Sequence, residues 1–282
     1  MYLKRINVFK IDFPVKRPFQ WRVVLFLVTL YFLGNLAGVP LLRKTNVLIE
    51  PVWFWSVATL ISAIIIALSL AMANRTCLGA PLLEAMLTKQ AFLSWGRSGL
   101  ALTLLMLVFG FPLSWMANLN VDPVTYPFGW ELLAASFKAG VVEEIFGRFF
   151  LVSLFVWIGR FFKSDTEGRP RHSVYWLSIL LGGLMFGWSH VDARLGHPTA
   201  TFWDYTLIMV LNTALGLYFG WLFWILGLEW AMIAHFAYDS FVSMIVVPVY
   251  LLENPIAWGL LIAGLMLALV ISWRMLTHVQ PD

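Results

Sequence analysis

The chain has 282 residues, of which 61% are hydrophobic and 12% are charged, and its mean hydropathy is +0.82. Because a soluble globular domain is close to half apolar and about a quarter charged, this composition excludes an ordinary soluble protein and predicts an all-α, polytopic membrane protein. The net charge is +4, but the basic residues lie in short loops beside apolar runs and form no continuous patch, so we expect no nucleic-acid partner.

The first 21 residues carry five lysine or arginine side chains ahead of the first long apolar run. No small-residue cleavage site follows that run, which predicts a retained membrane span and not a cleaved signal peptide. Residues 1–21 are expected to form a basic, amphipathic segment at the membrane surface, with Ile11 and Phe13 resting on lipid and Lys10 facing anionic headgroups. Membrane lipids are therefore expected partners.

Apolar runs long enough to cross a membrane recur along the chain. A transmembrane helix needs about 20 mostly apolar residues. The runs that meet this requirement are 22–42, 52–74, 93–118, 130–158, 174–191, 203–226, 229–249 and 256–275. We predict one domain, residues 22–275, in which about eight transmembrane helices form a bundle around an intramembrane polar cavity, followed by a short cytoplasmic tail at 276–282.

Lysine and arginine are distributed unequally between the loops on the two sides of the membrane that these runs would cross. With the N-terminus inside, fourteen of the 19 lie in inner segments and three lie in outer loops. The remaining two lie within the fourth run. Such a bias favours cytoplasmic termini, and we predict an integral protein of the bacterial cytoplasmic membrane in this orientation.

Two pairs of glycines spaced four residues apart occur in neighbouring runs. Gly183 and Gly187 lie in the fifth run, and Gly216 and Gly220 lie in the sixth. Small residues at this spacing allow two helix backbones to approach closely. We therefore expect these glycines to serve helix packing.

The fourth run contains charged side chains at membrane depth. Its central segment, GVVEEIFGRFF, holds Glu143, Glu144 and Arg148. Ionisable groups cost about 3 kcal/mol each at the centre of a bilayer, so they indicate a functional site. Glu144 and Arg148 share a helix face, which suits an ion pair, whereas Glu143 has no partner on its own helix and is the better candidate for a catalytic base. The flanking Gly140 and Gly147 leave space for a substrate backbone or a neighbouring helix.

Two further pairs of residues lie four apart on single helix faces. Phe186 and His190 end the fifth run, and His235 and Asp239 lie in the seventh. With the two glutamates they form a polar set drawn from three runs, which is expected to face the inside of the bundle. Structural alternatives remain open: a buried ion-pair network that fixes helix packing, and a histidine that is merely interfacial at a helix end.

This set supports two kinds of hydrolytic chemistry. A glutamate can act as general base on a water that a histidine orients, while other donors stabilise the oxyanion. Alternatively, Glu143, His190 and His235 can hold zinc, which itself activates the water. The chain lacks H-E-x-x-H, and the sequence leaves the cofactor open between zinc and none.

Several other catalytic classes are disfavoured by missing motifs. The chain contains no G-x-S-x-G, no G-x-G-D to supply the second aspartate of an aspartyl protease, and no P-loop. Its single cysteine, Cys77, excludes an internal disulfide and any paired-cysteine metal motif.

The ordered motifs E-E-x-x-x-R, F-x-x-x-H and H-x-x-x-D, within residues 140–240, resemble those of the CPBP family. That family comprises type II CAAX prenyl endopeptidases and bacteriocin-processing, Abi-like intramembrane proteases. The resemblance implies that Glu143 is the general base, that His190 shares the attacking water, and that His235 and Asp239 stabilise the oxyanion. It also implies that Glu144, Arg148 and Phe186 support the site.

One residue departs from the family pattern. The last motif position is commonly asparagine, whereas this chain has Asp239, and an ionised carboxylate would repel an oxyanion. The main hypothesis is an intramembrane protease that acts on a prenylated or bacteriocin-like membrane substrate. Two alternatives stay open: a non-catalytic scaffold or immunity factor that keeps the fold, and a proton-coupled transporter.

The predicted helix boundaries also conflict with the predicted site. They place Glu143 near the middle of the membrane, His190 near the outer end of its helix, and His235 about two turns from the inner side. These depths do not converge.

Overall fold

The computed structural model describes residues 8–44, 52–117, 129–192 and 201–277, and within these ranges the regular structure is helical. The helices are α1 Trp21–Lys44, α2 Val52–Ala73, α3 Lys89–Ala117, α4 Trp130–Lys138, α5 Ser153–Gly159, α6 His172–Asp192, α7 Phe202–Leu226, α8 Leu228–Phe241, α9 Val247–Leu252 and α10 Pro255–Thr277. Three π-helical segments, η1 Ala139–Glu143, η2 Ile145–Val152 and η3 Val242–Val246, join some of them into longer helices.

The helices confirm the predicted class, an all-α integral membrane protein. In the described part of the chain, six helices are long and apolar enough to span a membrane, and a shorter apolar helix covers Val57–Ala73. The continuous helix 130–159, which carries Glu143 and Glu144, is not among them. The total of eight spans and the cytoplasmic placement of the termini therefore stay predictions.

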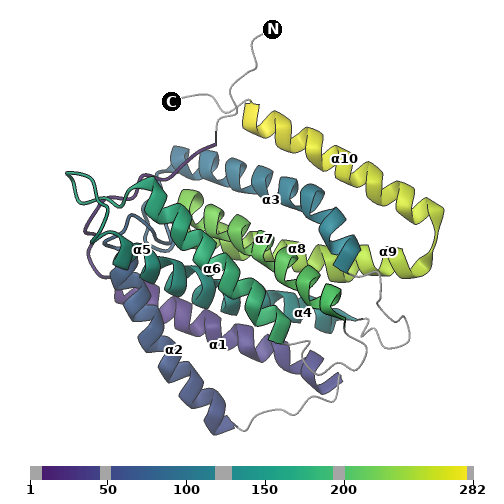
Figure 1. Ribbon diagram of the computed structural model, residues 1–282, viewed down its shortest axis with the longest axis horizontal. Helices are drawn as coiled ribbons and strands as arrows, with labels where there is room; N and C mark the ends of the chain where they lie inside the picture. Colours follow the sequence, from purple (N-terminus) through teal and green to yellow (C-terminus); the bar gives the residue numbers. More distant parts are fainter. Residues whose placement is uncertain (1–7, 45–51, 118–128, 193–200, 278–282) are drawn as a thin grey trace.

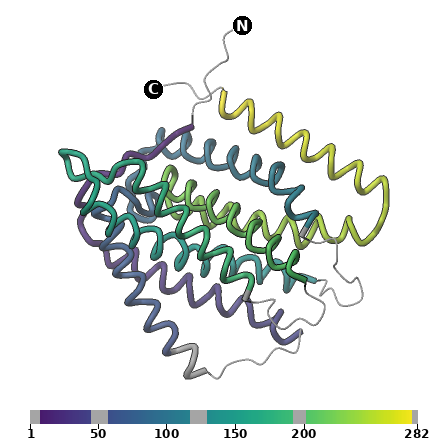
Figure 2. The backbone as a smooth tube through the Cα atoms, viewed as in Figure 1, coloured from purple at the N-terminus to yellow at the C-terminus, as the bar shows by residue number. Residues whose placement is uncertain are grey.

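The bundle is arranged around the helix 130–159 and α8 (Figures 1 and 2). α1 and α2 lie along one side of this centre, α6 and α7 pack against each other beside it, and α3 separates it from α10. α10 packs mainly against α3 and leaves large apolar side chains exposed, among them Leu260 and Met266. Such an apolar outer surface suits contact with lipid.

Close contact between α6 and α7 depends on the glycine pairs. A Cβ atom on Gly187 would lie 2.2 Å from Thr213 Oγ1 and 2.5 Å from the Met209 carbonyl oxygen. A Cβ atom on Gly216 would lie 2.8 Å from the Cα of Gly183. The glycines therefore pack helix against helix, as predicted.

The segment before α1 packs into the protein. Ile11 is 8% exposed and Phe13 is 1% exposed, and both belong to the main hydrophobic core. The Lys10 ammonium lies 4.5 Å from the centre of the Trp224 ring. The expectation that Ile11 and Phe13 rest on lipid is therefore wrong, because their side chains find apolar partners inside the bundle. The remaining boundaries of the predicted N-terminal segment and tail stay predictions, and residues 1–7 and 278–282 lie outside the described ranges.

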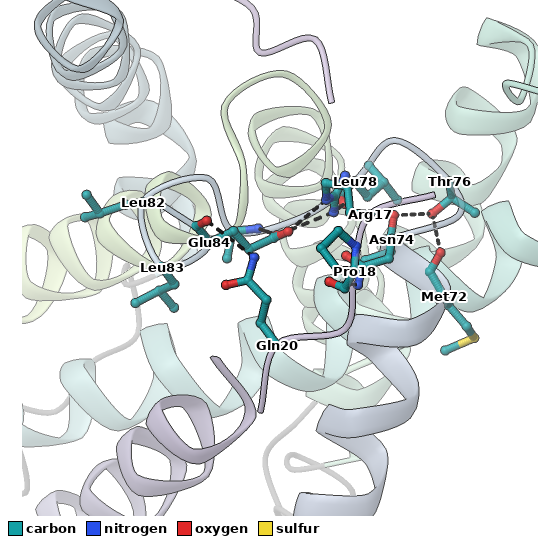
Figure 3. Close-up of polar contacts among 12 residues, drawn as sticks. Arg17, Pro18, Gln20, Met72, Asn74, Thr76, Leu78, Leu82, Leu83 and Glu84 are labelled. Atoms are coloured by element: carbon teal, nitrogen blue, oxygen red, sulfur yellow. Dashed lines mark hydrogen bonds and ion pairs between the residues drawn. The ribbon is translucent and has the colours of Figure 1, made fainter. Parts of the chain in front are cut away.

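A buried ion pair fastens this segment to the loop between α2 and α3 (Figure 3). Arg17 Nε lies 2.8 Å from Glu84 Oε2, and Arg17 also donates to the Leu78 carbonyl oxygen. The other oxygen of Glu84 accepts the backbone N–H of Ala80 at 2.8 Å. The side chains of Arg17 and Glu84 are 5% and 1% exposed, so this pair holds two segments of the chain together in a desolvated environment.

We predict that Glu84→Ala lowers the free energy of unfolding by about 3 kcal/mol, because it leaves the Arg17 charge buried without its partner. Unfolding by SDS titration in mixed micelles measures this. The matched control is Glu167→Ala, whose partner Arg169 lies in an exposed pair and contributes less than about 1 kcal/mol. Equal effects of the two substitutions would contradict the proposed role of the buried pair.

Candidate active site

The helix that carries the two glutamates is wound more widely than an α-helix. Residues 139–143 and 145–152 are π-helical, on either side of Glu144. π-Helical turns are rare and occur frequently at functional sites, because the extra residue per turn changes the direction in which side chains point. Here the widened turns include Glu143 and Arg148 and flank Glu144.

Glu143 lies between the two predicted histidines. Its Oε2 atom is 3.8 Å from His190 Nε2 and 3.9 Å from His235 Nε2. These separations are too long for direct hydrogen bonds and leave room for a bridging water. Glu143 is 37% exposed as a side chain, yet Oε2 itself is buried without a hydrogen-bond partner among the described residues. The structure thus brings Glu143, His190 and His235 together.

Glu144 is fully buried and lies between two cationic or protonatable groups. Its Oε1 atom is 2.7 Å from His235 Nδ1 and 2.9 Å from Arg148 Nη1. A carboxylate accepts hydrogen bonds, so the proton between Glu144 and His235 belongs to Nδ1, and Nε2 of the ring is directed toward Glu143. The predicted pair of Glu144 with Arg148 is present, and Glu144 additionally orients His235.

Aromatic rings fix the positions of these side chains. The His235 ring stacks on Phe219 with centroids 4.5 Å apart and an interplanar angle of 15°. The Arg148 guanidinium lies 4.3 Å from the centre of the Phe186 ring, which is also 4.5 Å from the His190 ring. Phe186 therefore contacts both the ion pair and a site histidine, and Phe219 is a contributor that no sequence motif singled out.

His190 is oriented by its own helix. Its Nδ1 atom lies 2.8 Å from the carbonyl oxygen of Phe186, one turn earlier. Because a carbonyl oxygen only accepts, Nδ1 carries the proton, and Nε2 is left to face Glu143.

The three side chains converge although the predicted depths differ. Gly159 and Val174 lie side by side, because a Cβ atom on Gly159 would contact Val174. Glu143 lies sixteen residues before Gly159, and His190 lies sixteen residues after Val174. The turn between α7 and α8 is buried, and its Leu226 carbonyl oxygen accepts a hydrogen bond from Trp95 Nε1 at 2.7 Å. α8 thus begins within the protein, and His235 is buried about two turns along it.

The two glycines that flank the glutamates have different surroundings. A Cβ atom on Gly140 would lie 2.9 Å from the Met232 carbonyl oxygen and from Phe236, so this glycine admits α8. A Cβ atom on Gly147 would have no neighbour within 4 Å. Of the two alternatives for these glycines, Gly140 serves a neighbouring helix, and only Gly147 borders open space.

A cavity of about 430 Å³ opens beside His190 and Asp239. Asp239 Oδ2 lies 3.5 Å from His235 Nε2, so the aspartate reaches the same ring nitrogen that faces Glu143. Most of the cavity wall is apolar, from side chains of α3, α4, α7 and α8. Polar groups also line it: Ser114, Ser136, Asn212, Tyr238 and Ser243. Asn212 was missed by motif reasoning, although a lone amide within an apolar run was a signal that could have found it.

The three predicted zinc ligands lie near one another. No group of three or more His, Cys, Asp or Glu side chains within the described ranges is arranged as a ready metal site. The contacts of Nδ1 in His235 with Glu144 and of Nδ1 in His190 with the Phe186 carbonyl oxygen leave both Nε2 atoms facing Glu143, and histidines that bind metals are held in the same way. The choice between zinc and no metal at Glu143, His190 and His235 therefore stays a prediction.

These features define a class: a polytopic helical membrane protein with carboxylates and histidines gathered inside its bundle. Residues 125–241 match the family model described as Type II CAAX prenyl endopeptidase Rce1-like. The matched segment contains every candidate site residue, so the resemblance that the motifs indicated is confirmed there. No curated protein and no solved structure matches the chain. The family match supports a CAAX-type intramembrane protease in general.

We predict that Arg148→Met lowers the free energy of unfolding by about 3 kcal/mol, because Glu144 then loses its cation in a fully buried position. The double variant Arg148→Met/Glu144→Gln is expected to be more stable than Arg148→Met, since no isolated charge remains. SDS titration of both variants measures the coupling, with Arg274→Met on the exposed end of α10 as the control. A double variant less stable than Arg148→Met would contradict the assignment.

Proposed function

We propose that the protein is an intramembrane endopeptidase that hydrolyses a peptide bond of a membrane-associated substrate with a water activated by Glu143. The observation that carries the proposal is the position of the Glu143 carboxylate within 4 Å of Nε2 of both His190 and His235, where His190 in turn lines a largely apolar cavity. The family match supports the same class of reaction.

In the proposed mechanism, a water lies between Glu143 and His190. The Glu143 carboxylate accepts one hydrogen of this water, and the free Nε2 of His190 accepts the other. The oxygen lone pair is thereby directed at the scissile carbonyl carbon. Proton transfer to Glu143 accompanies attack, and the peptide carbonyl becomes a tetrahedral oxyanion.

Collapse of this intermediate breaks the carbon–nitrogen bond. Glu143, now protonated, returns its proton to the leaving amine nitrogen, which restores the carboxylate. His235, held by Glu144 through Nδ1, faces the oxyanion with Nε2 and in its protonated form donates a hydrogen bond to it. Arg148 and Phe186 keep Glu144 and the two rings in place.

The wall of the cavity supports a substrate that is mainly apolar. Leu113, Leu132, Leu211 and Leu215 come from three different helices and surround the space next to His190. An extended peptide segment with an apolar or lipid-modified end fits such a surface, while the few hydroxyl and amide groups are available for its backbone. Prenylated and bacteriocin-like substrates both meet this description.

We predict that Glu143→Gln lowers kcat by about 10²- to 10⁴-fold, the usual contribution of a general base, because an amide does not accept the proton of water. Cleavage of a farnesylated fluorogenic peptide by the protein in liposomes is the measurement. The control is Glu131→Gln on the same helix, whose carboxylate pairs with Lys44 away from the site and whose loss leaves kcat unchanged. A folded Glu143→Gln protein with full activity would refute the mechanism.

The aspartate at position 239 favours the alternative function, a non-catalytic scaffold, because an ionised carboxylate would repel an oxyanion. We predict that Asp239→Asn retains or raises peptidase activity, since an amide still accepts from His235 and adds a donor for the oxyanion. Asp239→Leu, which keeps the bulk without either function, is expected to reduce kcat by about tenfold or more. If wild type and Asp239→Asn are both inactive on every membrane peptide while Glu143→Gln keeps the cellular phenotype, the scaffold is the better description.

A further inference from the structure

A second cavity, separate from the active site, lies between the end of α5 and the first turns of α6. Its volume is about 410 Å³. Its lining includes Ile158, Phe162 and Lys163 on one side and Ser173, Leu177 and Leu181 on α6. The missing side chain of Gly159 brings α5 against Val174, because a Cβ atom there would lie 2.6 Å from Val174 Cγ1. This contact forms the floor of a groove along the two helices.

The groove has one apolar and one cationic end. Along α6 it extends from Ser173 to Leu181, eight residues or about 12 Å of helix rise. Its apolar walls face outward: Leu177 is 58% exposed and Phe162 is 82% exposed. At the other end, Lys163 forms part of the lining.

A second cation lies beside Lys163. The backbone N–H of Arg171 donates to the Lys163 carbonyl oxygen at 3.1 Å, so the two residues are neighbours across the base of the loop that joins α5 to α6. Both side chains are exposed, and neither forms an ion pair within the described part of the chain.

The acidic side chains of the same loop are engaged elsewhere. Glu167 pairs with Arg169 at 3.1 Å, and Asp165 accepts the backbone N–H groups of Glu167 and Arg169. Arg169 also pairs with Asp12. Lys163 and Arg171 are therefore the cations of this loop that form no ion pair among the described residues, and the Ser173 hydroxyl shares the lining with Lys163.

We propose that this groove binds one anionic glycerophospholipid, with an acyl chain between α5 and α6 and the phosphate at Lys163 and Arg171. Charge complementarity selects the headgroup, because Lys163 lines the polar end and Arg171, its neighbour through the backbone, adds a second exposed cation close to it. The apolar length of the groove selects a chain, since a free phosphate would leave Leu177 and Leu181 uncovered. The site is independent of the peptidase assignment and does not share residues with it.

The experiment uses the full-length protein in a neutral detergent and phosphatidylglycerol that carries a photoactivatable diazirine in one acyl chain. After irradiation, the sites of labelling are mapped by peptide mass spectrometry. The expected adducts lie on Ile158, Phe162, Leu177 and Leu181. Unlabelled phosphatidylglycerol should prevent labelling at a concentration about tenfold lower than the concentration of phosphatidylcholine that is needed. Inorganic phosphate at the same concentration as phosphatidylglycerol should not prevent labelling.

The double variant Lys163→Ala/Arg171→Ala tests the headgroup contacts. Each cation near an anionic lipid strengthens binding severalfold, so loss of both should weaken competition by about tenfold or more. The control is Lys89→Ala/Arg97→Ala, which removes two exposed cations from the first turns of α3. They are eight residues apart, as Lys163 and Arg171 are, and their loss should leave labelling of the groove unchanged. Three results would each overturn the proposal. Adducts could be distributed evenly over the apolar surface, phosphatidylcholine could compete as well as phosphatidylglycerol, or the two double variants could have equal effects.

Discussion

The structure depends on the buried carboxylate of Glu144. An isolated charge at this depth would be too costly to keep, and the protein surrounds it with Arg148 at 2.9 Å on its own helix and His235 at 2.7 Å on α8. Satisfying this one group ties the helix 130–159 to α8 and fixes which nitrogen of His235 carries a proton. The ring nitrogen of His235 that faces Glu143 is then set by a residue that is itself fully buried. Glu143, the neighbour in sequence, is left with an oxygen that has no hydrogen-bond partner among the described residues, and the two glutamates thus separate into a supporting and a candidate catalytic role.

The helices and most of the polar set could be predicted from the sequence because both follow from local rules. Apolar runs of about 20 residues indicate spans, and residues four apart share a helix face whatever the rest of the chain does. The pairing of Glu144 with Arg148 and the grouping of His235 with Asp239 are of this kind. The ion pairing of Glu144, and not of Glu143, with an arginine was also predictable, since only Glu144 has a cation one turn away.

What the sequence did not predict depends on contacts between distant segments. The pairing of Glu144 with His235 joins residues 91 positions apart, and Phe219 contributes its ring without any motif to indicate it. The convergence of Glu143, His190 and His235 was not predictable from hydropathy, because hydropathy gives the length of a helix but not how it packs against its neighbours. Ile11 and Phe13 were assigned to lipid for a similar reason: an apolar side chain at a membrane protein's edge has two apolar environments available, and only packing decides between them.

The buried turn between α7 and α8 is held by segments that are distant in sequence. Buried backbone groups need hydrogen-bond partners, and here three remote parts of the chain supply them. Ile11 donates to the Ile225 carbonyl oxygen, Trp95 donates to that of Leu226, and Leu228 donates to that of Gly79. This turn joins the helix that carries Phe219 to the helix that carries His235, whose rings stack. The residues before α1 therefore help to hold the junction on which the position of that stacked pair depends.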